Sequence, residues 1–312
     1  MLYEGDCLEW LKTRRRLSIH AAITDPPFSF VEYSTEDMEK LRSGRGGIWR
    51  IPPSIGGSRR RPLPRFSVLS ESDIENVYQR TYTWATALNR VLVPGAHAFV
   101  ASQQLLSYQV TRAFADAGYE VRGQVVRLVR TFRGGDRPKG AEAEFPSVSA
   151  SARASWEPWL IFRKPLEGTL AENLRKWGTG GLRRSSRSSP FRDVISSGRP
   201  PQREKSIAPH PTLKPQTFLR ELVRASLPLG KGVILDCFAG SGSTLAACAA
   251  VGYRAVGVEL DSQYVVMAAS AIPQLAVLYP DDLGPVGPAA REATPEELSL
   301  PGLVRLQTAA GA

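Results

Sequence analysis

Short apolar runs alternate with amphipathic segments through most of this 312-residue chain. Runs typical of buried strands occupy residues 21–23, 96–101, 121–132, 156–162, 232–236 and 254–258. Segments with helical spacing occupy residues 7–17, 72–92, 105–117, 215–227, 243–251 and 262–271. Because strands alternate with helices, the pattern predicts an α/β fold with a mostly parallel, doubly wound sheet and right-handed crossovers.

Two local signals set helix boundaries. Ser72, with Glu75 three residues later, has the spacing of a capping box and predicts a helix that starts there. Pro94-Gly95 predicts the end of that helix, with a buried strand beginning at Ala96.

Three stretches show neither pattern. Residues 31–70 and 163–209 are expected to be long loops, the first because glycines and prolines punctuate it. A long loop in a compact domain is usually a lid or a binding loop and is otherwise disordered, and we favour a substrate loop for 31–70. Residues 273–312 are expected to be a poorly ordered tail, because Pro, Gly and acids dominate from residue 280 onward.

Charge sharpens the interpretation of the two loops. The chain has a net charge of +10 and a pI near 9.8. Residues 40–70 carry eight Lys or Arg and no acid, and residues 163–209 carry eleven against four acids. Such concentration favours a surface for a polyanion, most simply nucleic acid, over a uniformly basic coat, although a solvated basic loop is the alternative. The candidate DNA-binding residues are Arg45, Arg59, Arg60, Arg61, Arg183, Arg184 and Arg187.

Cysteine and histidine usage excludes several classes of protein. Cys7, Cys237 and Cys248 are too few and too scattered for a disulfide framework or a zinc cluster, which fits a reducing compartment. Three histidines likewise offer little for a metal site. Without an apolar signal region or a run of membrane-spanning length, we expect a cytoplasmic protein with no membrane partner.

The first candidate for chemistry is the turn Asp25-Pro26-Pro27-Phe28. The apolar run before it predicts a strand, and the prolines end that strand because neither can donate to a sheet ladder. Asp25 and Phe28 should therefore lie at the carboxyl end of a strand, where ligands bind in open α/β sheets. The alternative is an ordinary Pro-Pro turn.

The second candidate is the stretch 233–244, a strand followed by a glycine-rich turn and a helix start. Gly240 and Gly242 permit close backbone approach, and the helix amino terminus at Ser243 can hold an anionic group. Glu259 ends the next strand and can accept hydrogen bonds from ribose hydroxyls. A P-loop would need Lys at residue 243, and a dinucleotide site would need a small residue at 245, so S-adenosylmethionine fits best. A merely tight strand-to-helix turn is the alternative.

These motifs resemble those of the S-adenosylmethionine-dependent DNA amino-methyltransferases, which methylate adenine N6 or cytosine N4. Residues 25–28 resemble the catalytic motif of that family and residues 236–242 its cofactor motif. The catalytic motif comes first, as in the circularly permuted β class. Gly5-Asp6 and the segments 156–165 and 210–215 are also similar, so the resemblance covers residues 1–272.

The resemblance implies a Rossmann-like methyltransferase fold with inserted basic loops. Residues 1–165 would form its catalytic half, 166–209 the target-recognition region and 210–272 the cofactor-binding half. The residues implied for the cofactor are Asp6, Cys7, Asp25, Thr212, Lys214, Asp236, Phe238, Ala239, Gly240, Ser241, Gly242, Ser243, Thr244, Glu259 and Leu260. Among these, Glu259 would bind the ribose, Asp6 and Phe238 the adenosine end, and Ser243, Thr244 and Thr212 the methionine end. Helix capping and surface charge are the alternatives for Thr212 and Lys214.

The implied reaction is direct methyl transfer to the amine of a flipped base in double-stranded DNA. Asp25 and the Pro26 carbonyl would accept hydrogen bonds from the amine, Pro27 would stiffen the turn, and Phe28 would stack on the base. An acid at residue 25 is typical of adenine enzymes, whereas Phe28 replaces the commoner tyrosine, so cytosine N4 is the alternative. RNA or protein-amide methylation and a catalytically silent DNA-binding homologue are further alternatives. The resemblance also admits a homodimer, a cognate restriction endonuclease and nucleoid association through DNA.

Overall fold

The computed structural model describes residues 1–27, 54–55, 58–59, 71–129, 138, 140–149, 152, 154–210, 212–279 and 303–304. The strands are β1 (Leu2–Glu4), β2 (Ile19–Thr24), β3 (Ser54–Ile55), β4 (Ser58–Arg59), β5 (Leu92–Ala101), β6 (Glu120–Leu128), β7 (Trp156–Arg163), β8 (Val194–Ser196), β9 (Val233–Asp236), β10 (Arg254–Glu259) and β11 (Leu303–Val304). The helices are α1 (Cys7–Thr13), α3 (Glu71–Val91), α4 (Ser107–Asp116), α5 (Leu170–Trp177), α6 (Gln202–Ile207), α7 (Gln216–Ser226), α8 (Ser243–Val251) and α9 (Ser262–Ala276).

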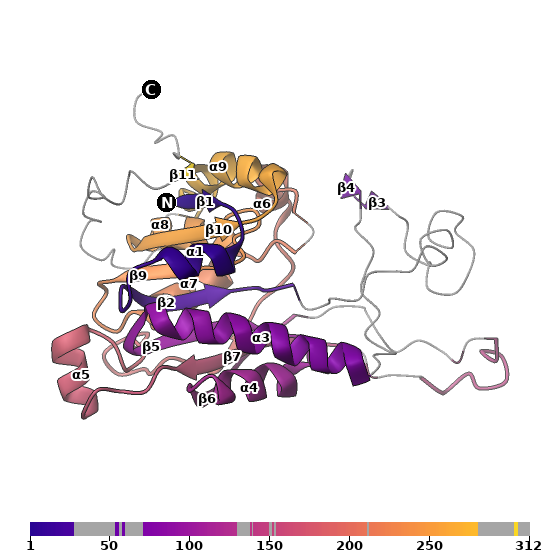
Figure 1. The fold of residues 1–312 in the computed structure, drawn as a ribbon. Helices are drawn as coiled ribbons and strands as arrows, with labels where there is room; N and C mark the ends of the chain where they lie inside the picture. The colour runs from indigo at the N-terminus through magenta and orange to yellow at the C-terminus, as the bar shows by residue number, and fades with distance from the viewer. Residues whose placement is uncertain are drawn as a thin grey trace, which may run out of the picture.

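One mostly parallel sheet organises these elements, in the strand order β11-β1-β10-β9-β2-β5-β7-β6-β8 (Figure 1). β7 runs antiparallel to β5 and β6, and β11 runs antiparallel to β1, while the other pairings are parallel. The predicted α/β fold with a mostly parallel sheet is therefore confirmed. β3 and β4 form a separate antiparallel pair.

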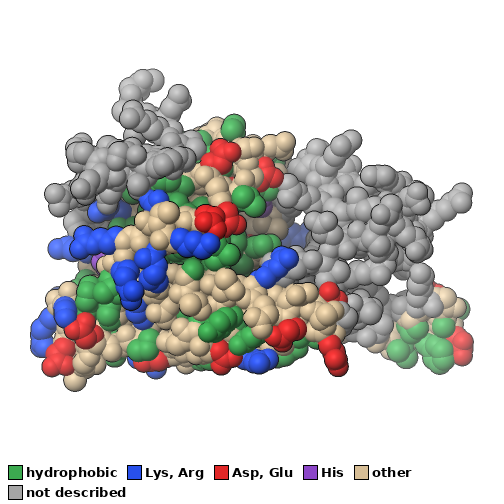
Figure 2. Space-filling view, viewed as in Figure 1, with side chains coloured by type: hydrophobic (Ala, Val, Ile, Leu, Met, Phe, Trp, Pro, Cys, Tyr) green, Lys and Arg blue, Asp and Glu red, His purple; other side chains and the backbone are tan. Residues whose placement is uncertain are grey.

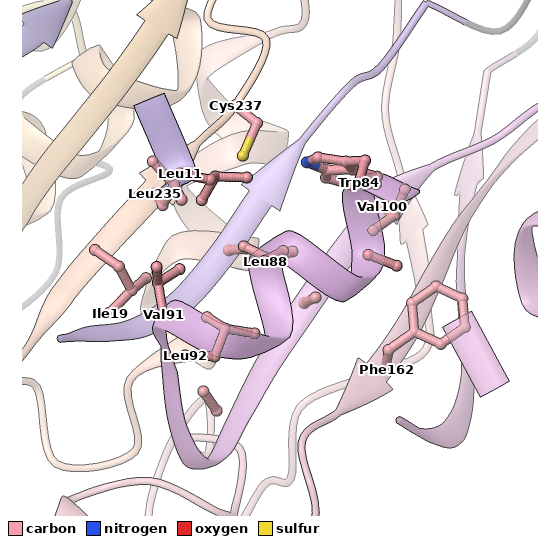
Figure 3. Packing of buried hydrophobic residues seen from close by; sticks show 14 of the residues in the cluster. Leu11, Ile19, Trp84, Leu88, Val91, Leu92, Val100, Phe162, Leu235 and Cys237 are labelled. Atoms are coloured by element: carbon pink, nitrogen blue, oxygen red, sulfur yellow. The ribbon is translucent and has the colours of Figure 1, made fainter. Parts of the chain in front are cut away.

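The sheet is covered on both faces because side chains along each strand alternate between them. From β2, Ala22 joins a core cluster with residues of α1, α3 and α4, among them Leu11 and Leu88 (Figure 3). Ala21 and Ile23 point the other way and join residues of α7 and α8. This burial on both faces explains why β2 is a continuous apolar run rather than an alternating one.

The register of the parallel strands brings their carboxyl ends to one edge of the sheet. β2 pairs with β9 through Ala22 and Leu235, and β9 pairs with β10 through Asp236 and Gly257. The turns that follow these three strands are therefore neighbours. We call this side of the sheet the carboxyl edge and the opposite side the amino edge.

Two predicted boundaries at α3 are wrong. The helix begins at Glu71, so Ser72 lies inside it rather than at its cap. Strand β5 begins at Leu92 and includes Pro94-Gly95, where the pairing with β2 is irregular and Gly95 has a φ of 75°. The Pro94 carbonyl accepts hydrogen bonds from the Asn173 and Thr179 side chains, which replace the ladder bonds that a regular strand would make.

The segment 163–209 is less loop-like than its composition predicts, since it contains α5, β8 and α6. Helix α5 starts with a capping box formed by Thr169 and Glu172 and ends at Gly178, which has a φ of 72°. Both signals stand in the sequence and could have predicted the helix.

The expected disordered tail begins too early. Helix α9 continues to Ala276, and Leu275 is fully buried. The buried Arg220 guanidinium donates hydrogen bonds to the carbonyls of Leu275, Ala276 and Tyr279, which holds the end of this helix. The predictions for Phe28, Arg45, Arg60, Arg61, the other residues of loop 31–70 and most of the tail lie outside the described residues, and only the backbone of Arg59 is described.

Candidate active site

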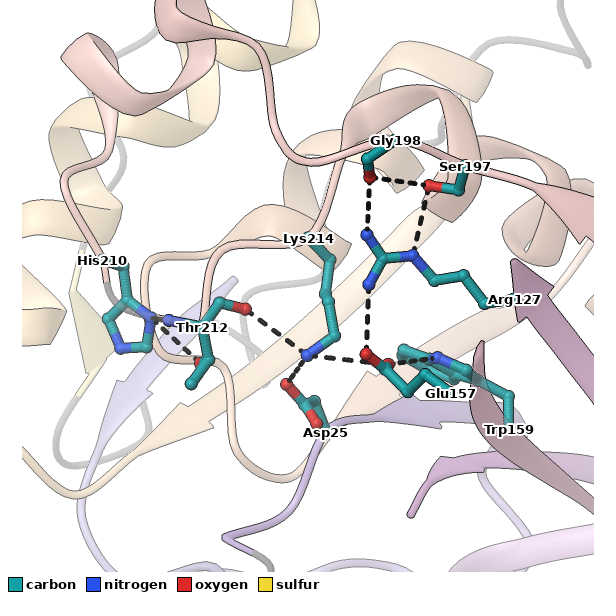
Figure 4. Close-up of polar contacts among 9 residues, drawn as sticks. All are labelled: Asp25, Arg127, Glu157, Trp159, Ser197, Gly198, His210, Thr212 and Lys214. Atoms are coloured by element: carbon teal, nitrogen blue, oxygen red, sulfur yellow. Dashed lines mark hydrogen bonds and ion pairs between the residues drawn. The ribbon is translucent and has the colours of Figure 1, made fainter. Parts of the chain in front are cut away.

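Asp25 immediately follows β2 at the carboxyl edge, and Pro26 and Pro27 come next. One carboxylate oxygen, Oδ2, accepts a hydrogen bond from the Lys214 ammonium group (Figure 4). The other, Oδ1, is buried and has no hydrogen-bond partner within the described residues. Lys214 therefore holds one oxygen of the Asp25 carboxylate, and the second oxygen can accept a hydrogen bond from a group outside the described residues.

Lys214 belongs to a chain of four charged side chains that starts at Asp25 (Figure 4). Its Nζ atom lies 3.8 Å from Oε1 of Glu157, which is on β7. The other Glu157 oxygen accepts a hydrogen bond of 3.1 Å from Arg127 of β6. Arg127 in turn donates to the Ser197 hydroxyl and to the Gly198 carbonyl, both at 3.1 Å. Two of the four charges are positive and two negative, so the cluster is balanced.

Burial and these neighbours shift the titration of both groups at the centre of the cluster. Burial raises the pKa of Asp25, and the nearby Glu157 adds to that effect, while Lys214 opposes it. Burial lowers the pKa of Lys214, but the carboxylates of Asp25 and Glu157 outweigh burial, so the pKa is raised. Lys214 is therefore a buried, charged partner of Asp25, and the interpretation as a surface charge is wrong.

Asp236 links the Asp25 turn to the glycine-rich turn. It ends β9, and its Oδ1 accepts hydrogen bonds from the Thr24 hydroxyl at 2.7 Å and from the Phe238 backbone at 3.1 Å. The Thr244 hydroxyl is a third partner. Burial raises the pKa of Asp236 to about 6, which these hydrogen bonds only partly offset. The residue before Asp25 is thus fixed directly to the start of the predicted cofactor turn.

The glycine-rich turn is closely packed against its neighbours. Gly242 has a φ of 79°, and a Cβ there would lie 2.5 Å from Ile272. The Gly240 amide donates to Oε2 of Glu259 at 2.7 Å, and the Asp261 amide donates to Oε1 at 2.9 Å. Glu259 therefore ties two turns of the carboxyl edge together. Ala239, Ser241, Ser243 and Thr244 lie in the same turn and are buried.

Four other predicted cofactor residues, Asp6, Cys7, Phe238 and Leu260, differ in their exposure. Asp6 follows β1 and caps α1, accepting hydrogen bonds from the Leu8 and Glu9 amides. Leu260 is 69% exposed beside Glu259. The Cys7 side chain is instead buried in the core, and the Phe238 ring packs edge-on against Trp84. The side chain of Cys7 thus has a structural role.

His210 opens the segment 210–215 that resembles the family, although it was not among the predicted site residues. Its Nδ1 atom lies 3.2 Å from the Thr212 hydroxyl, and its ring packs edge-on against Tyr264 at a centroid distance of 4.4 Å. A Cβ at Gly240 would come within 3.3 Å of the same ring. Helix α7 has Pro215 at its cap without a side-chain hydrogen bond, so Thr212 does not cap it.

The basic residues predicted in segment 163–209 differ in their surroundings, and the first of them lies far from the Asp25 turn. Arg183 lies at the amino edge, where its guanidinium donates to the Tyr253 hydroxyl at 2.5 Å and its amide donates to the Ala225 carbonyl. Several Lys and Arg side chains appear on that side, near α5, in Figure 2. The Arg184 guanidinium donates a hydrogen bond to the Ser188 carbonyl, and Arg187 is exposed. The structure therefore does not bring Arg183 to Asp25.

Arg127, Glu157 and His210 are the site residues that sequence reasoning missed.

Within the described ranges, no group of three or more His, Cys, Asp or Glu could hold a metal ion. No helix in the described part of the chain is both long enough and apolar enough to cross a membrane.

Comparison with known proteins gives the same family as the motifs. A family model described as DNA methylase (N6_N4_Mtase) matches residues 19–270. The chain is 25% identical over 283 residues to the Type II methyltransferase M.HindIII of Haemophilus influenzae, covering 83% of this chain and 90% of that protein.

Two solved structures share the fold at low sequence identity. The DNA modification methylase TTHA0409 of Thermus thermophilus, complexed with S-adenosyl-L-methionine, has a TM-score of 0.54 at 20% identity, covering 89% of this chain and 96% of that one. The cytosine-N4-specific PvuII DNA methyltransferase has a TM-score of 0.56 at 13% identity, covering 92% and 93%. Because the family model spans most of its length, this chain belongs to the N6/N4 DNA methylase family.

Proposed function

We propose that this protein transfers a methyl group from S-adenosylmethionine to the exocyclic amine of a flipped base in double-stranded DNA, with adenine N6 favoured over cytosine N4. The arrangement of Asp25 carries the proposal. One carboxylate oxygen is held by Lys214, while the other is buried and lacks a hydrogen-bond partner among the described residues. Through Thr24 and Asp236 this acid adjoins the glycine-rich turn, as an amine acceptor beside a cofactor site must.

The residues of that turn fit S-adenosylmethionine. A carboxylate has about four lone-pair sites, and the two backbone amides on Glu259 leave room for both ribose hydroxyls. The exposed Leu260 offers an apolar surface for adenine, and Ser243 and Thr244 begin a helix whose amino terminus suits a carboxylate. The Thermus thermophilus neighbour is complexed with this cofactor. When bound, the cofactor supplies an electrophilic methyl group on a sulfonium.

The chain's own contribution is to improve the nucleophile. An amine on a base shares its lone pair with the ring, so it attacks poorly. Asp25 and the Pro26 carbonyl accept hydrogen bonds from the amine hydrogens, which favours a pyramidal nitrogen and stabilises the positive charge that develops on it. The two prolines keep these acceptors aimed, and we assign Phe28 to stacking on the base.

Asp25 and Phe28 bear differently on the choice of base. The resemblance makes an acid at residue 25 typical of adenine enzymes, and this favours adenine N6. Phe28 stands where tyrosine is commoner, and this departure keeps cytosine N4 as the second candidate.

The topology supports two further proposals about organisation. The chain is a circularly permuted methyltransferase of the β class, since β2 precedes β9 in sequence and pairs with it directly. The target-recognition region lies within 166–209, and its part after β8 lies nearest the site, because Ser197 and Gly198 contact Arg127. A homodimer and a cognate restriction endonuclease stay predictions.

Mapping of modified bases tests the function directly. The full chain is expressed in a host without DNA methylation, and methylated bases are mapped across the genome. We expect N6-methyladenine at one recurrent motif, whereas N4-methylcytosine would select the second candidate. The Asp25→Ala variant should leave the genome unmodified while it still binds S-adenosylmethionine by calorimetry. An unmethylated genome, together with no methyl transfer to duplex DNA by the purified protein, would refute the proposal.

A further inference from the structure

We infer that Arg127 and Glu157 are positioning residues that, through Lys214, aim Asp25 and couple it to the Ser197-Gly198 segment. This inference rests on the proposed function, since it assigns roles toward the acid that accepts the amine. Arg127 lies outside the segments that resemble the family, and Glu157 lies within one of them, 156–165, which assigned it no role. Arg127 is on β6 and Glu157 is on β7. Figure 4 shows Lys214 between Asp25 and Glu157, with Arg127 on the far side of Glu157.

Arg127 is held more rigidly than a surface arginine. Its exposed fraction is 3%, and its three guanidinium nitrogens each donate a hydrogen bond of 3.1 Å. The acceptors are Glu157, the Ser197 hydroxyl and the Gly198 carbonyl, which come from two separate segments of the chain. A buried guanidinium with such partners fixes the geometry of whatever it holds.

Glu157 is fixed on both sides of its carboxylate. Arg127 donates to Oε2, and the buried Trp159 indole donates to Oε1 at 2.8 Å. The same Oε1 lies 3.8 Å from Nζ of Lys214. The Lys214 ammonium group therefore lies between two carboxylates, and its positive charge stabilises the ionised forms of both Asp25 and Glu157.

This arrangement of charges determines how the cluster responds to pH. The charged groups that face Asp25 are Lys214, Glu157, Arg127 and Asp236. Glu157 raises the pKa of Asp25, whereas Lys214 and Arg127 lower it. Removing the charge of Glu157 should therefore ease ionisation of Asp25. Removing Arg127 should hinder it, because Glu157 then relies on Lys214 alone for a positive partner.

The link to Ser197-Gly198 gives the cluster a second consequence. This pair follows β8 and precedes α6, inside the region proposed to recognise the target. If DNA moves the pair, two of the three acceptors of Arg127 move with it, and the change reaches Asp25 through Glu157 and Lys214. We expect the Ser197→Ala variant to lower the single-turnover rate more than it changes the affinity for DNA.

The test compares Glu157→Gln, Arg127→Met and Arg127→Lys with the wild-type enzyme. Single-turnover methylation of duplex DNA is measured from pH 5 to 9, and cofactor affinity is measured by calorimetry. Because Asp25 acts when ionised, the acidic limb of the profile should move to lower pH in Glu157→Gln and to higher pH in Arg127→Met, each by roughly one unit. Arg127→Lys should restore most of the shift, and cofactor affinity should stay within about twofold of wild type, well below a tenfold change.

Glu120→Gln is the matched control. Glu120 pairs with Arg163 at 2.5 Å, but this ion pair lies at the amino edge of the sheet. The same substitution there should leave the acidic limb unmoved. The inference would be overturned if the acidic limb of the pH–rate profile did not move in Glu157→Gln, or if it moved in the same direction in Glu157→Gln and Arg127→Met. In either case, methyl transfer by the wild-type enzyme would still support the proposed function.

A spectroscopic readout makes the inference independent of turnover. The carboxyl titration of Asp25, followed by carbon-13 NMR in the wild-type chain and in Glu157→Gln, should show a lower pKa in the variant. Gln is nearly isosteric with Glu, so this comparison remains decisive if Arg127→Met does not fold. An unchanged Asp25 titration in Glu157→Gln would refute the inference, and a wild-type chain without methyl transfer would refute the proposed function instead.

Discussion

Replacement of Asp236 by Asn should stabilise the protein at neutral pH, although it alters the turn proposed to bind the cofactor. Asp236 is 3% exposed, and burial raises its pKa to about 6 from a reference value of 3.8. An acid whose pKa is higher in the folded state opposes folding whenever it is ionised. The substitution removes this penalty and keeps the hydrogen bonds, because an Asn carbonyl accepts from Thr24 and its amide donates to the Thr244 hydroxyl.

The pKa shift sets the expected magnitude. Above the folded pKa the penalty is complete, and linkage gives about 3 kcal/mol at pH 7.5. At pH 5 the folded-state carboxyl is mostly protonated, and roughly half of this penalty remains. Below the unfolded pKa the penalty vanishes. The advantage of Asp236→Asn should therefore shrink by roughly half between pH 7.5 and pH 5.

Urea denaturation of the two proteins at both pH values measures this difference. The exposed Asp193 gives a baseline for the exchange, through Asp193→Asn. A midpoint that rises in Asp236→Asn at pH 7.5 and converges toward wild type at pH 5 supports the reasoning. A variant that is less stable at pH 7.5, or one whose advantage is the same at both pH values, would show that burial does not dominate at Asp236.

Three further outcomes are expected. Because burial raises the pKa of Asp25 above its usual value, the single-turnover rate should fall as pH is lowered through that raised pKa. A rate that stays flat from pH 8 down to about pH 4 would contradict this assignment. Gly242→Ala should cost about 2–4 kcal/mol in a denaturation experiment, since its φ is 79° and the new Cβ would lie 2.5 Å from Ile272; a loss below about 0.5 kcal/mol would count against the packing argument. Arg203 is exposed on α6, which follows the Ser197-Gly198 pair. Arg203→Gln should weaken DNA binding and lower the salt slope by about one, whereas Arg183→Gln at the amino edge should do neither. Equal slopes in the two variants would mean that DNA contacts both arginines.

The fold was predictable wherever the signal was local. The apolar run of β2 and the spacing of α7 identify these elements without knowledge of their partners. Strand β8 has three residues and depends on pairing with β6, so no local pattern reveals it. Pro94-Gly95 is tolerated in β5 only because Asn173 and Thr179 satisfy the freed carbonyl, and both come from a distant segment.

The site divides in the same way. The Asp25 turn and the 236–244 turn are contiguous motifs, and the chain shows them directly. Glu157 could not be predicted as a neighbour of Asp25, because it lies near the start of its strand. In a parallel sheet it would lie at the amino edge. β7 runs antiparallel to β5 and β6, and this reversal carries Glu157 to the carboxyl edge, where Lys214 meets it.

Asp25 and Asp236 both lie at the carboxyl edge, but we expect only Asp25 to need its negative charge. Asp236 is buried and Asp25 is partly buried, and both have a raised pKa. Asp25 faces an ammonium group, whereas Asp236 faces hydroxyls and a backbone amide. Hydroxyls can also donate to a neutral acceptor, so Asp236 needs no charge for its hydrogen bonds. In the proposed reaction, Asp25 must stay ionised to accept hydrogen bonds from both an amine hydrogen and the Lys214 ammonium group. Asp25→Asn should therefore abolish methyl transfer, while Asp236→Asn should retain it in a more stable protein, as filter assays with radiolabelled cofactor on duplex DNA can measure. Loss of cofactor binding in Asp236→Asn would show that the charge of Asp236 serves the cofactor and that this division between the two acids is wrong.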